Sequence, residues 1–281
     1  PAILAEVSSI AMQYIDSAMV GSLGARATAA IGLVSSTTWL FGGMCVALIT
    51  GFSVQIAQLI GGGRRDEVQS VLRQGLMVSL LFSVVFASVG IGISGGLPVW
   101  LGGAPDVCPD SSRYFFIYAC ALPAVLFRQA AGSMLQCSGD MRTPSMLNIL
   151  MCALDVVFNT LFIFPSRPFS LLGLTLSLPG AGLGVAGAAL GTATAEVITA
   201  ALMLYCLCFR SPVLRLVKGV PWRLERRCLR TAARLSLPMA LERLIMCGAQ
   251  IASTRIVAPL GTVAVASNSL AVTAESFCYM P

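Results

Sequence analysis

Long apolar stretches without charge dominate the pattern of this chain. No Asp, Glu, Lys or Arg occurs from Ala27 to Gly63, and none occurs from Gln74 to Pro105. A run of more than about 18 mostly apolar residues is long enough to cross a bilayer as a helix. The pattern predicts an all-α polytopic membrane protein with about eight spans, at roughly 2–20, 31–60, 74–97, 112–137, 145–165, 183–209, 236–257 and 264–281.

Composition excludes a soluble domain. Charged residues make up 11% of the chain, against about 25% in soluble proteins, and the mean hydropathy is +0.86. The chain has ten cysteines and no histidine. Most of the cysteines fall in apolar spans, where Cys behaves as a small hydrophobic residue. We therefore expect no metal centre of the zinc type and no cofactor.

Basic residues gather on one side of the predicted spans. The stretch 210–235 carries eight of them, three more lie between the second and third spans and one follows the fourth, whereas the opposite side has only Arg26, Arg113 and Arg167. The positive-inside rule then places the N-terminus and the 210–235 loop in the cytoplasm. We expect the loop to contact anionic lipid, with "LERRCLRTAARL" as an amphipathic surface helix. Nucleic-acid binding would need interleaved aromatic residues, and Trp222 alone does not supply them.

The chain also repeats itself. A shift of 237 residues aligns nine identical residues over thirty-three positions without a gap, among them Gly24 with Gly261. The unit holds six spans, an even number, so two units enter the membrane from the same side as parallel repeats. We therefore expect a first six-helix lobe over 1–209, a basic linker over 210–235 and the start of a second lobe over 236–281. Both ends lie in apolar segments, and we expect a fragment of a longer protein of twelve helices.

Six of the twelve carboxylates lie inside predicted spans. A carboxylate at the middle of a bilayer costs about 2.5–3.5 kcal/mol, so it is rarely kept without a use. These residues predict a polar interior that handles cations or protons; they are Glu6, Asp16, Asp155, Glu196, Glu242 and Glu275.

Helical spacing groups these acids with other polar residues into stripes. The stripes are Glu6, Gln13 and Asp16 in the first span, Asn148, Asp155 and Asn159 in the fifth, and Thr192, Glu196 and Thr199 in the sixth. Their oxygens suit a hard monovalent cation and suit a proton equally well. The alternative is that Asn and Thr only hydrogen-bond between helices. Arg128 either pairs with one of the acids or extends to the inner face, and Glu242 and its neighbour Arg243 face different partners.

Five passages resemble the multidrug and toxic compound extrusion (MATE) family over the whole chain. They are "YIDSAMVGSLGARATAAIGL", "CSGDMRTPSMLNILMCALDVVFNTLFIF", "GAGLGVAGAALGTATAEV", "LPMALERLIMCGAQ" and "TRIVAPLGTVAVASNSLAVTAESFCYMP". The resemblance implies two six-helix lobes around a cavity of alternating access. It also implies export of organic, often cationic compounds in exchange for Na+ or H+.

The resemblance further implies an ion site in the first lobe. Asp16 matches the acid of the family's first helix, and Thr192 matches its threonine in the sixth. In the fifth helix, Asp155 stands where the family often has Asn, and Asn159 where some members have Asp. Asp16, Asp155 and Asn159 are thus candidate Na+ ligands.

Several other functions are weighed against export. A flippase for a lipid-linked oligosaccharide, which some relatives of this fold perform, needs a cationic cavity, whereas the carboxylates predict an acidic one. An intramembrane aspartyl protease needs a GxGD motif, which is absent, and a channel does not need the repeat. We therefore expect no enzyme but a monomeric antiporter of the plasma (inner) membrane, with an organic cation and the lipid bilayer as its partners.

Overall fold

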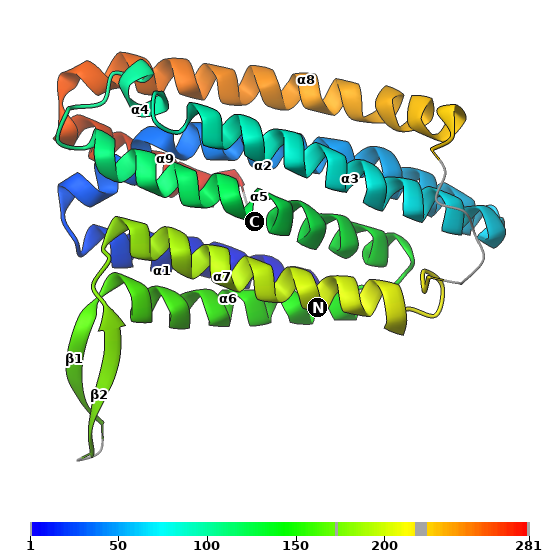
Figure 1. Ribbon diagram of the computed structural model, residues 1–281, viewed down its shortest axis with the longest axis horizontal. Coiled ribbons are helices and arrows are strands. Elements are labelled where there is room, and N and C mark those ends of the chain that lie inside the picture. Colours follow the sequence, from blue (N-terminus) through cyan, green and yellow to red (C-terminus); the bar gives the residue numbers. More distant parts are fainter. Residues whose placement is uncertain (1, 172–173, 217–223, 280–281) are drawn as a thin grey trace.

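The computed structural model is a bundle of long helices that run side by side (Figure 1), and it describes residues 2–171, 174–216 and 224–279. Short turns connect most of the neighbouring helices, and one short helix follows the third long one. The elements are α1 (Ala2–Gly21), α2 (Ala25–Gly61), α3 (Arg65–Ile93), α4 (Leu97–Trp100), α5 (Cys108–Cys137), α6 (Arg142–Ile163), α7 (Val185–Tyr205), α8 (Arg226–Val257) and α9 (Thr262–Tyr279).

The predicted all-α polytopic fold is confirmed. Within the described residues, six helices are long and apolar enough to cross a membrane: α2, α3, α5, α6, α7 and α8. The outer face of α3 exposes a run of large apolar side chains, including Leu80, Leu81 and Val84. Such a surface is stable only against lipid or another apolar surface. The protein is therefore a multi-pass membrane protein.

The core lies between α2, α3 and α5. Phe41 of α2 packs edge-on against Phe86 of α3, with ring centroids 5.3 Å apart, and against Phe115 of α5 at 5.8 Å. Toward the other end of the bundle, Phe52 and Leu72 belong to a second apolar cluster with residues of α5, α7 and α8. The two clusters fix the relative positions of the helices that carry the polar residues.

The basic segment differs from its prediction. Residues 226–235 form the first turns of α8 and continue into the membrane helix, so they are not a separate surface helix. The cause is close packing on α2: a Cβ at Gly51 would overlap Ser236 Oγ and the carbonyl oxygen of Ala232. Two basic residues of the predicted loop, Lys218 and Arg223, lie outside the described residues.

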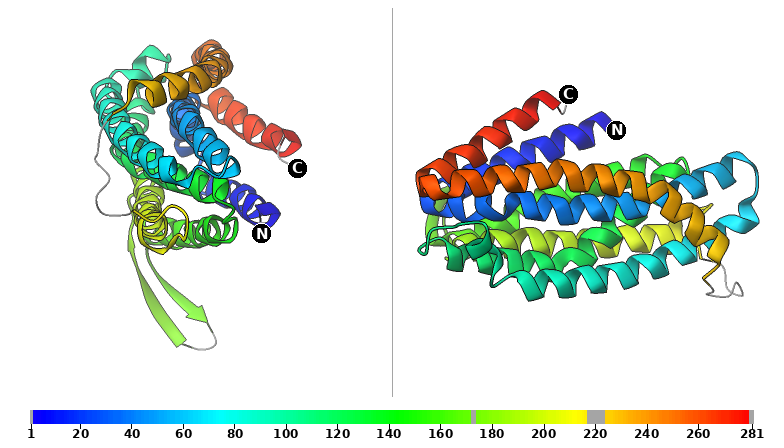
Figure 2. Two further views of the ribbon diagram at one scale, coloured as in Figure 1. Left: turned by 90° about the vertical axis from the view of Figure 1, so that its right-hand side faces the viewer. Right: turned by 90° about the horizontal axis from the view of Figure 1, so that it is seen from above.

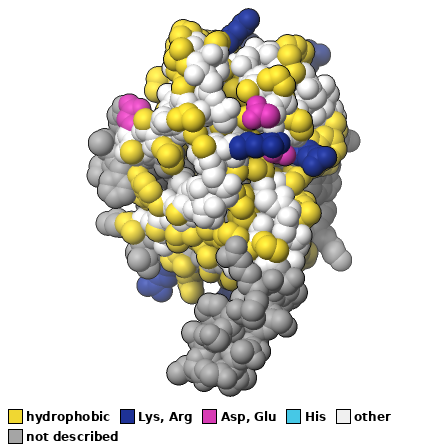
Figure 3. All heavy atoms as spheres, turned by 90° about the vertical axis from the view of Figure 1, so that its left-hand side faces the viewer, with side chains coloured by type: hydrophobic (Ala, Val, Ile, Leu, Met, Phe, Trp, Pro, Cys, Tyr) yellow, Lys and Arg dark blue, Asp and Glu magenta, His cyan; other side chains and the backbone are white. Residues whose placement is uncertain are grey.

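A β-hairpin between α6 and α7 was not predicted. Its strands, β1 (Pro165–Leu171) and β2 (Leu174–Ala181), pair antiparallel and project from one end of the bundle (Figure 1). Figure 3 shows this end, where the described surface is mostly hydrophobic or neutral with a few charged side chains. One of the ion pairs at this end joins Arg26 to Asp110 at 3.2 Å.

The repeat detected in the sequence has a counterpart in the backbone. Gly24 precedes α2 with φ 102° and ψ 174°, and Gly261 precedes α9 with φ 105° and ψ 170°. L-residues with a side chain rarely adopt this conformation, which explains glycine at both positions. The N-terminal and C-terminal helices α1 and α9 also lie on the same side of the bundle (Figure 2).

Gly24→Ala is expected to lower the free energy of unfolding by about 1–3 kcal/mol. No atom lies within 4 Å of an added Cβ at Gly24, so the cost comes from the backbone conformation alone. Denaturant unfolding in micelles measures it. Gly21→Ala is the matched control, because its Cβ also meets open space and Gly21 has no positive φ. Equal stability of both variants would contradict the conformational explanation.

The turn before α6 explains the motif "GDMRTP". Gly139 adopts φ 91°, and Asp140 Oδ1 then accepts hydrogen bonds from the backbone N–H groups of Arg142 and Thr143 at 3.2 and 3.1 Å. Partial burial raises the pKa of Asp140. Three hydrogen bonds, the two from the backbone and a third from the Thr143 side chain, act in the opposite direction, as does the charge of Arg210. Together they hold the pKa below 3.8. The ionised carboxylate therefore caps the helix.

Asp140→Ala is expected to lower the free energy of unfolding by about 1 kcal/mol at pH 7. Because the pKa of Asp140 is lower in the folded state, its stabilisation is present above about pH 4 and is lost as the pH falls through the folded-state pKa. Denaturant titrations of both proteins from about pH 7 to pH 3 should show the difference shrinking below about pH 4. Asp140→Asn, which still caps, should keep most of the stability; a pH-independent difference for Asp140→Ala would contradict the assignment.

Candidate functional site

A cluster of two carboxylates and one amide joins α1 to α6. The Nδ2 atom of Asn159 donates to Asp16 Oδ1 and to Asp155 Oδ2, both at 3.0 Å. Asp155 and Asn159 are 0% and 1% exposed. One amide thus holds the buried Asp155 and the half-buried Asp16 together, as the spacing of the fifth-span stripe and the acid in the first span allow.

Close packing of α7 on α6 positions this amide. A Cβ at Gly191 would overlap the Oδ1 atom of Asn159, and a Cβ at Gly187 would overlap the backbone of Phe162. The two glycines are four residues apart and therefore share one face of α7. Thr192, next to Gly191, lines the same region as Asp16 and Asn159.

Gly191→Ala is expected to lower the free energy of unfolding by about 1–3 kcal/mol, because the added methyl group must displace Asn159 and with it both hydrogen bonds to the acids. Denaturant unfolding in micelles measures this. Gly92→Ala, on α3 with open space around its Cβ, is the control. Wild-type stability of Gly191→Ala would contradict the packing role.

The cluster retains unused oxygen atoms. Asp155 Oδ1 and Asn159 Oδ1 are buried and have no hydrogen-bond partner among the described residues. Buried hydrogen-bond acceptors are nearly always satisfied. Two unpaired oxygen atoms in a cluster that holds two carboxylates therefore mark a candidate site for a cation or a proton. The two carboxylates are oxygen donors of the kind that Na+ prefers, whereas Asn159 presents its Nδ2 atom to them and its oxygen to Gly191.

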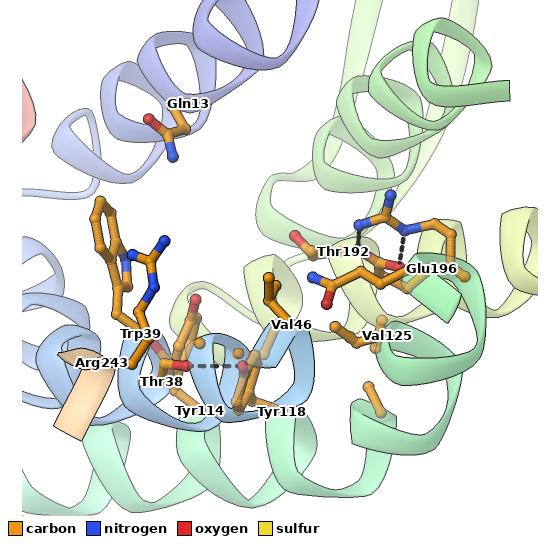
Figure 4. A pocket seen from close by; sticks show the side chains of 17 residues that line it. Gln13, Thr38, Trp39, Val46, Tyr114, Tyr118, Val125, Thr192, Glu196 and Arg243 are labelled. Atoms are coloured by element: carbon orange, nitrogen blue, oxygen red, sulfur yellow. Dashed lines mark hydrogen bonds and ion pairs between the residues drawn. The ribbon is translucent and has the colours of Figure 1, made fainter. Parts of the chain in front are cut away.

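A large cavity of about 490 Å³ lies beside this cluster (Figure 4). Residues of α1, α2, α5, α7 and α8 line it, and Figure 4 shows Trp39 and Arg243 on one side with Thr192 and Glu196 on the other. Tyr114 and Thr192 line both this cavity and a smaller one of about 110 Å³ that reaches Asp16 and Asn159. The ion cluster and the large cavity therefore share a wall.

A second polar network lies in the wall of the large cavity. Arg128 Nε and Nη2 donate to the two carboxylate oxygens of Glu196 at 2.5 and 3.0 Å, and Nη1 donates to Asn148 Oδ1 at 3.1 Å. Arg128 is thus a partner for an acid rather than a residue that extends to the membrane surface. Asn148 and Glu196 belong to this pair and not to the Asp16 cluster.

The other predicted site residues are dispersed. Glu242 is exposed on α8 and Glu275 on α9, whereas Thr199 is buried and donates to the backbone oxygen of Ala195 within α7. The side chain of Glu6 lies outside the described residues. Gln13 lines the large cavity.

The cavity of about 490 Å³ does not have the expected acidic lining, whereas an adjoining one of about 250 Å³, which shares Gln13 and Trp39 with it, is lined by Asp16. Two arginines and one glutamate line the larger cavity, because the acids of α1 and α6 face one another around Asn159 instead. The sequence did not predict that Trp39 and Arg243 lie together in the lining of this cavity. The sequence signal for Trp39 was its position as the one tryptophan in the uncharged stretch from Ala27 to Gly63.

Fold and site together define a multi-pass helical membrane protein with a solute-sized cavity and a buried carboxylate cluster. The MatE family model matches residues 1–161, more than half of the chain, and the chain belongs to this family. Among curated proteins it is similar to the multidrug resistance protein NorM of Aliivibrio fischeri, at 28% identity over the whole chain and 58% of that protein. The multidrug resistance protein MdtK of Yersinia pestis is also 28% identical, over the whole chain and 59% of that protein.

A similar solved structure is that of the MATE multidrug transporter DinF-BH. It superposes with a TM-score of 0.87 at 19% identity, and the match covers 100% of this chain and 60% of that one. At this identity the likeness concerns the fold. The chain spans a little under three fifths of the length of the two curated relatives.

Proposed function

We propose that this chain forms part of a secondary active antiporter, which exports organic small molecules in exchange for Na+ or H+. The observation that carries the proposal is the buried cluster in which Asn159 bridges Asp16 and Asp155 while two oxygens stay unpaired. The curated relatives are named multidrug resistance proteins, which supports an organic solute for the cavity.

In the proposed mechanism, the cluster alternates between an occupied and a free state. Asp16 and Asp155 carry the negative charge, and the Asn159 amide holds them close enough to share one cation. Asp155 Oδ1, which has no hydrogen-bond partner among the described residues, provides a further ligand for Na+, while a proton would bind a carboxylate oxygen directly. Occupancy removes the repulsion between the acids, which favours one arrangement of the lobes over the other and alternates access to the cavity.

The proposed setting is the plasma (inner) membrane, with the N-terminus and the 210–235 segment in the cytoplasm. The excess of arginine at the end of the bundle with Arg64, Arg142 and Arg226 supports this orientation. We expect the protein to act as a monomer in the lipid bilayer and not to bind nucleic acid.

Efflux from cells that produce the complete protein tests the proposal. Cells are loaded with ethidium, a fluorescent cation, or with fluorescein, a fluorescent anion, and efflux is followed with an inward Na+ gradient, an inward H+ gradient or neither. The proposal expects efflux of at least one dye under one gradient and none when that gradient is dissipated. Efflux that ignores both gradients, or none of either dye with the protein present in the membrane, would overturn it.

The flippase alternative gains no support from the cavity. A pyrophosphate head group needs several cationic side chains, and one of the two arginines, Arg128, is already paired with Glu196. A single remaining arginine suits a singly charged group better.

A further inference from the structure

We propose that the large cavity accepts organic anions in which a carboxylate is attached to an aromatic ring, with Arg243 as the anion-binding residue and Trp39 as the stacking surface. The inference rests on the proposed function and deepens it, because it names the class of compound that the cavity takes. The sequence favoured cationic substrates, and the side chains of the cavity favour the opposite charge.

The charge of the lining is the first argument. Its charged residues are Arg128, Glu196 and Arg243. The bidentate ion pair between Arg128 and Glu196 neutralises two of the three charges, which leaves the positive charge of Arg243. An organic cation would find the cavity's acid already engaged by a guanidinium, and it would meet a second cation across the cavity.

The position of Arg243 is the second argument. Its aliphatic stem lies on α2 at Gly43, where an added Cβ would be 3.2 Å from Cδ and 3.3 Å from Cγ of the arginine. The absence of a side chain at Gly43 lets the guanidinium extend beside Trp39 at the cavity edge (Figure 4). Among the described residues, no carboxylate lies within ion-pair distance of Arg243. The adjacent Glu242 points away by about 100° around the helix.

The aromatic surface beside the guanidinium is the third argument. Trp39 precedes Gly43 by four residues, so both lie on the same face of α2. The indole is 44% exposed, whereas the other large apolar side chains of α2, apart from Val46, are buried or half-buried. A flat apolar surface next to a planar fork of donors matches a ring that carries a carboxylate, which can accept two parallel hydrogen bonds. Tyr118 does not compete, because its hydroxyl donates to the backbone oxygen of Thr38 at 2.9 Å.

Anion export also agrees with the proposed ion exchange. A cation that moves inward and an anion that moves outward both carry charge in the direction favoured by an inside-negative membrane potential. A bound cation cancels one of the two negative charges of the ion cluster, which weakens its repulsion of an anion in the neighbouring cavity.

Equilibrium binding to the complete purified protein tests the inference with three probes of one ring and different charge. They are naphthalene-2-carboxylate, the neutral naphthalene-2-carboxamide and 2-naphthylmethylammonium, measured at saturating NaCl. We expect the carboxylate to bind at least about tenfold more tightly than the ammonium compound, since hydrogen bonds to charged groups contribute this much. Equal or tighter binding of the ammonium compound would overturn the proposal.

Variants assign the effect to Arg243. Arg243→Gln should weaken binding of the carboxylate about tenfold and leave the carboxamide unchanged, and Arg243→Lys should restore part of the affinity. Arg255→Gln is the matched control, since Arg255 is an exposed arginine of the same helix outside the cavity lining. Unchanged carboxylate binding by Arg243→Gln would overturn the assignment.

The two proposals fail in different ways. Binding needs no gradient, so a wrong ion-exchange mechanism leaves the probe preference intact and removes only gradient-driven efflux. A wrong anion assignment leaves gradient-driven efflux intact and reverses the preference toward ethidium and the ammonium probe.

Discussion

Asp155→Asn is expected to abolish gradient-driven efflux while the protein remains in the membrane at its normal level. Asp155 is 0% exposed, and Asn has nearly the same shape, so the contacts around it are preserved while the charge is lost. The cluster then offers one carboxylate instead of two. Efflux of ethidium and fluorescein with and without the driving gradient measures the loss, with a membrane blot as the check on production.

Asp16→Asn should give the same result, because Asp16 supplies the other carboxylate bound by Asn159. Asp110→Asn is the control: Asp110 lies at the start of α5 and pairs with the exposed Arg26. Normal efflux by both cluster variants would sink the proposed ion site, whatever the identity of the coupling ion.

Glu196→Gln is expected to lower the free energy of unfolding by about 3–5 kcal/mol, because it leaves the Arg128 guanidinium without its carboxylate inside the bundle. The side chains of Arg128 and Glu196 are 18% and 8% exposed, so water replaces little of the lost interaction. Denaturant or thermal unfolding in micelles measures the change.

The double variant Arg128→Met with Glu196→Leu is the matched comparison. It removes both charges and keeps the volume, so most of the stability should return. If Glu196→Gln alone were as stable as the wild type, the pair would have no structural role, and Glu196 would become a candidate for ion coupling again.

The apolar runs were enough to predict the long helices and the fold class. The apolar runs could not place the ends of the helices. Gly24 allows α2 to begin at Ala25, although the pattern predicted that residues 21–30 connect two spans. The first turns of α8 read as a surface helix because of their arginines, whereas packing at Gly51 draws them into the bundle. The hairpin was missed because its short alternating strands adjoin apolar spans.

Spacing predicted which polar residues share a helix face, but it could not say which faces meet. Asp155 and Asn159 were assigned to one stripe, and their contact with Asp16 depends on how α1 packs against α6. Glu196 was grouped with the ion site by its chemistry, and Arg128 claims it in the structure. The proximity of Trp39 and Arg243 joins residues far apart in the chain, which a single sequence does not reveal.

The wall formed by Tyr114 and Thr192 has a thermodynamic consequence. Both side chains border the large cavity and the smaller one at Asp16. If cation occupancy changes the affinity for an organic ligand by some factor, the ligand must change the affinity for the cation by the same factor. A ligand titration at several Na+ concentrations therefore yields the coupling free energy between the two sites, without any transport being measured.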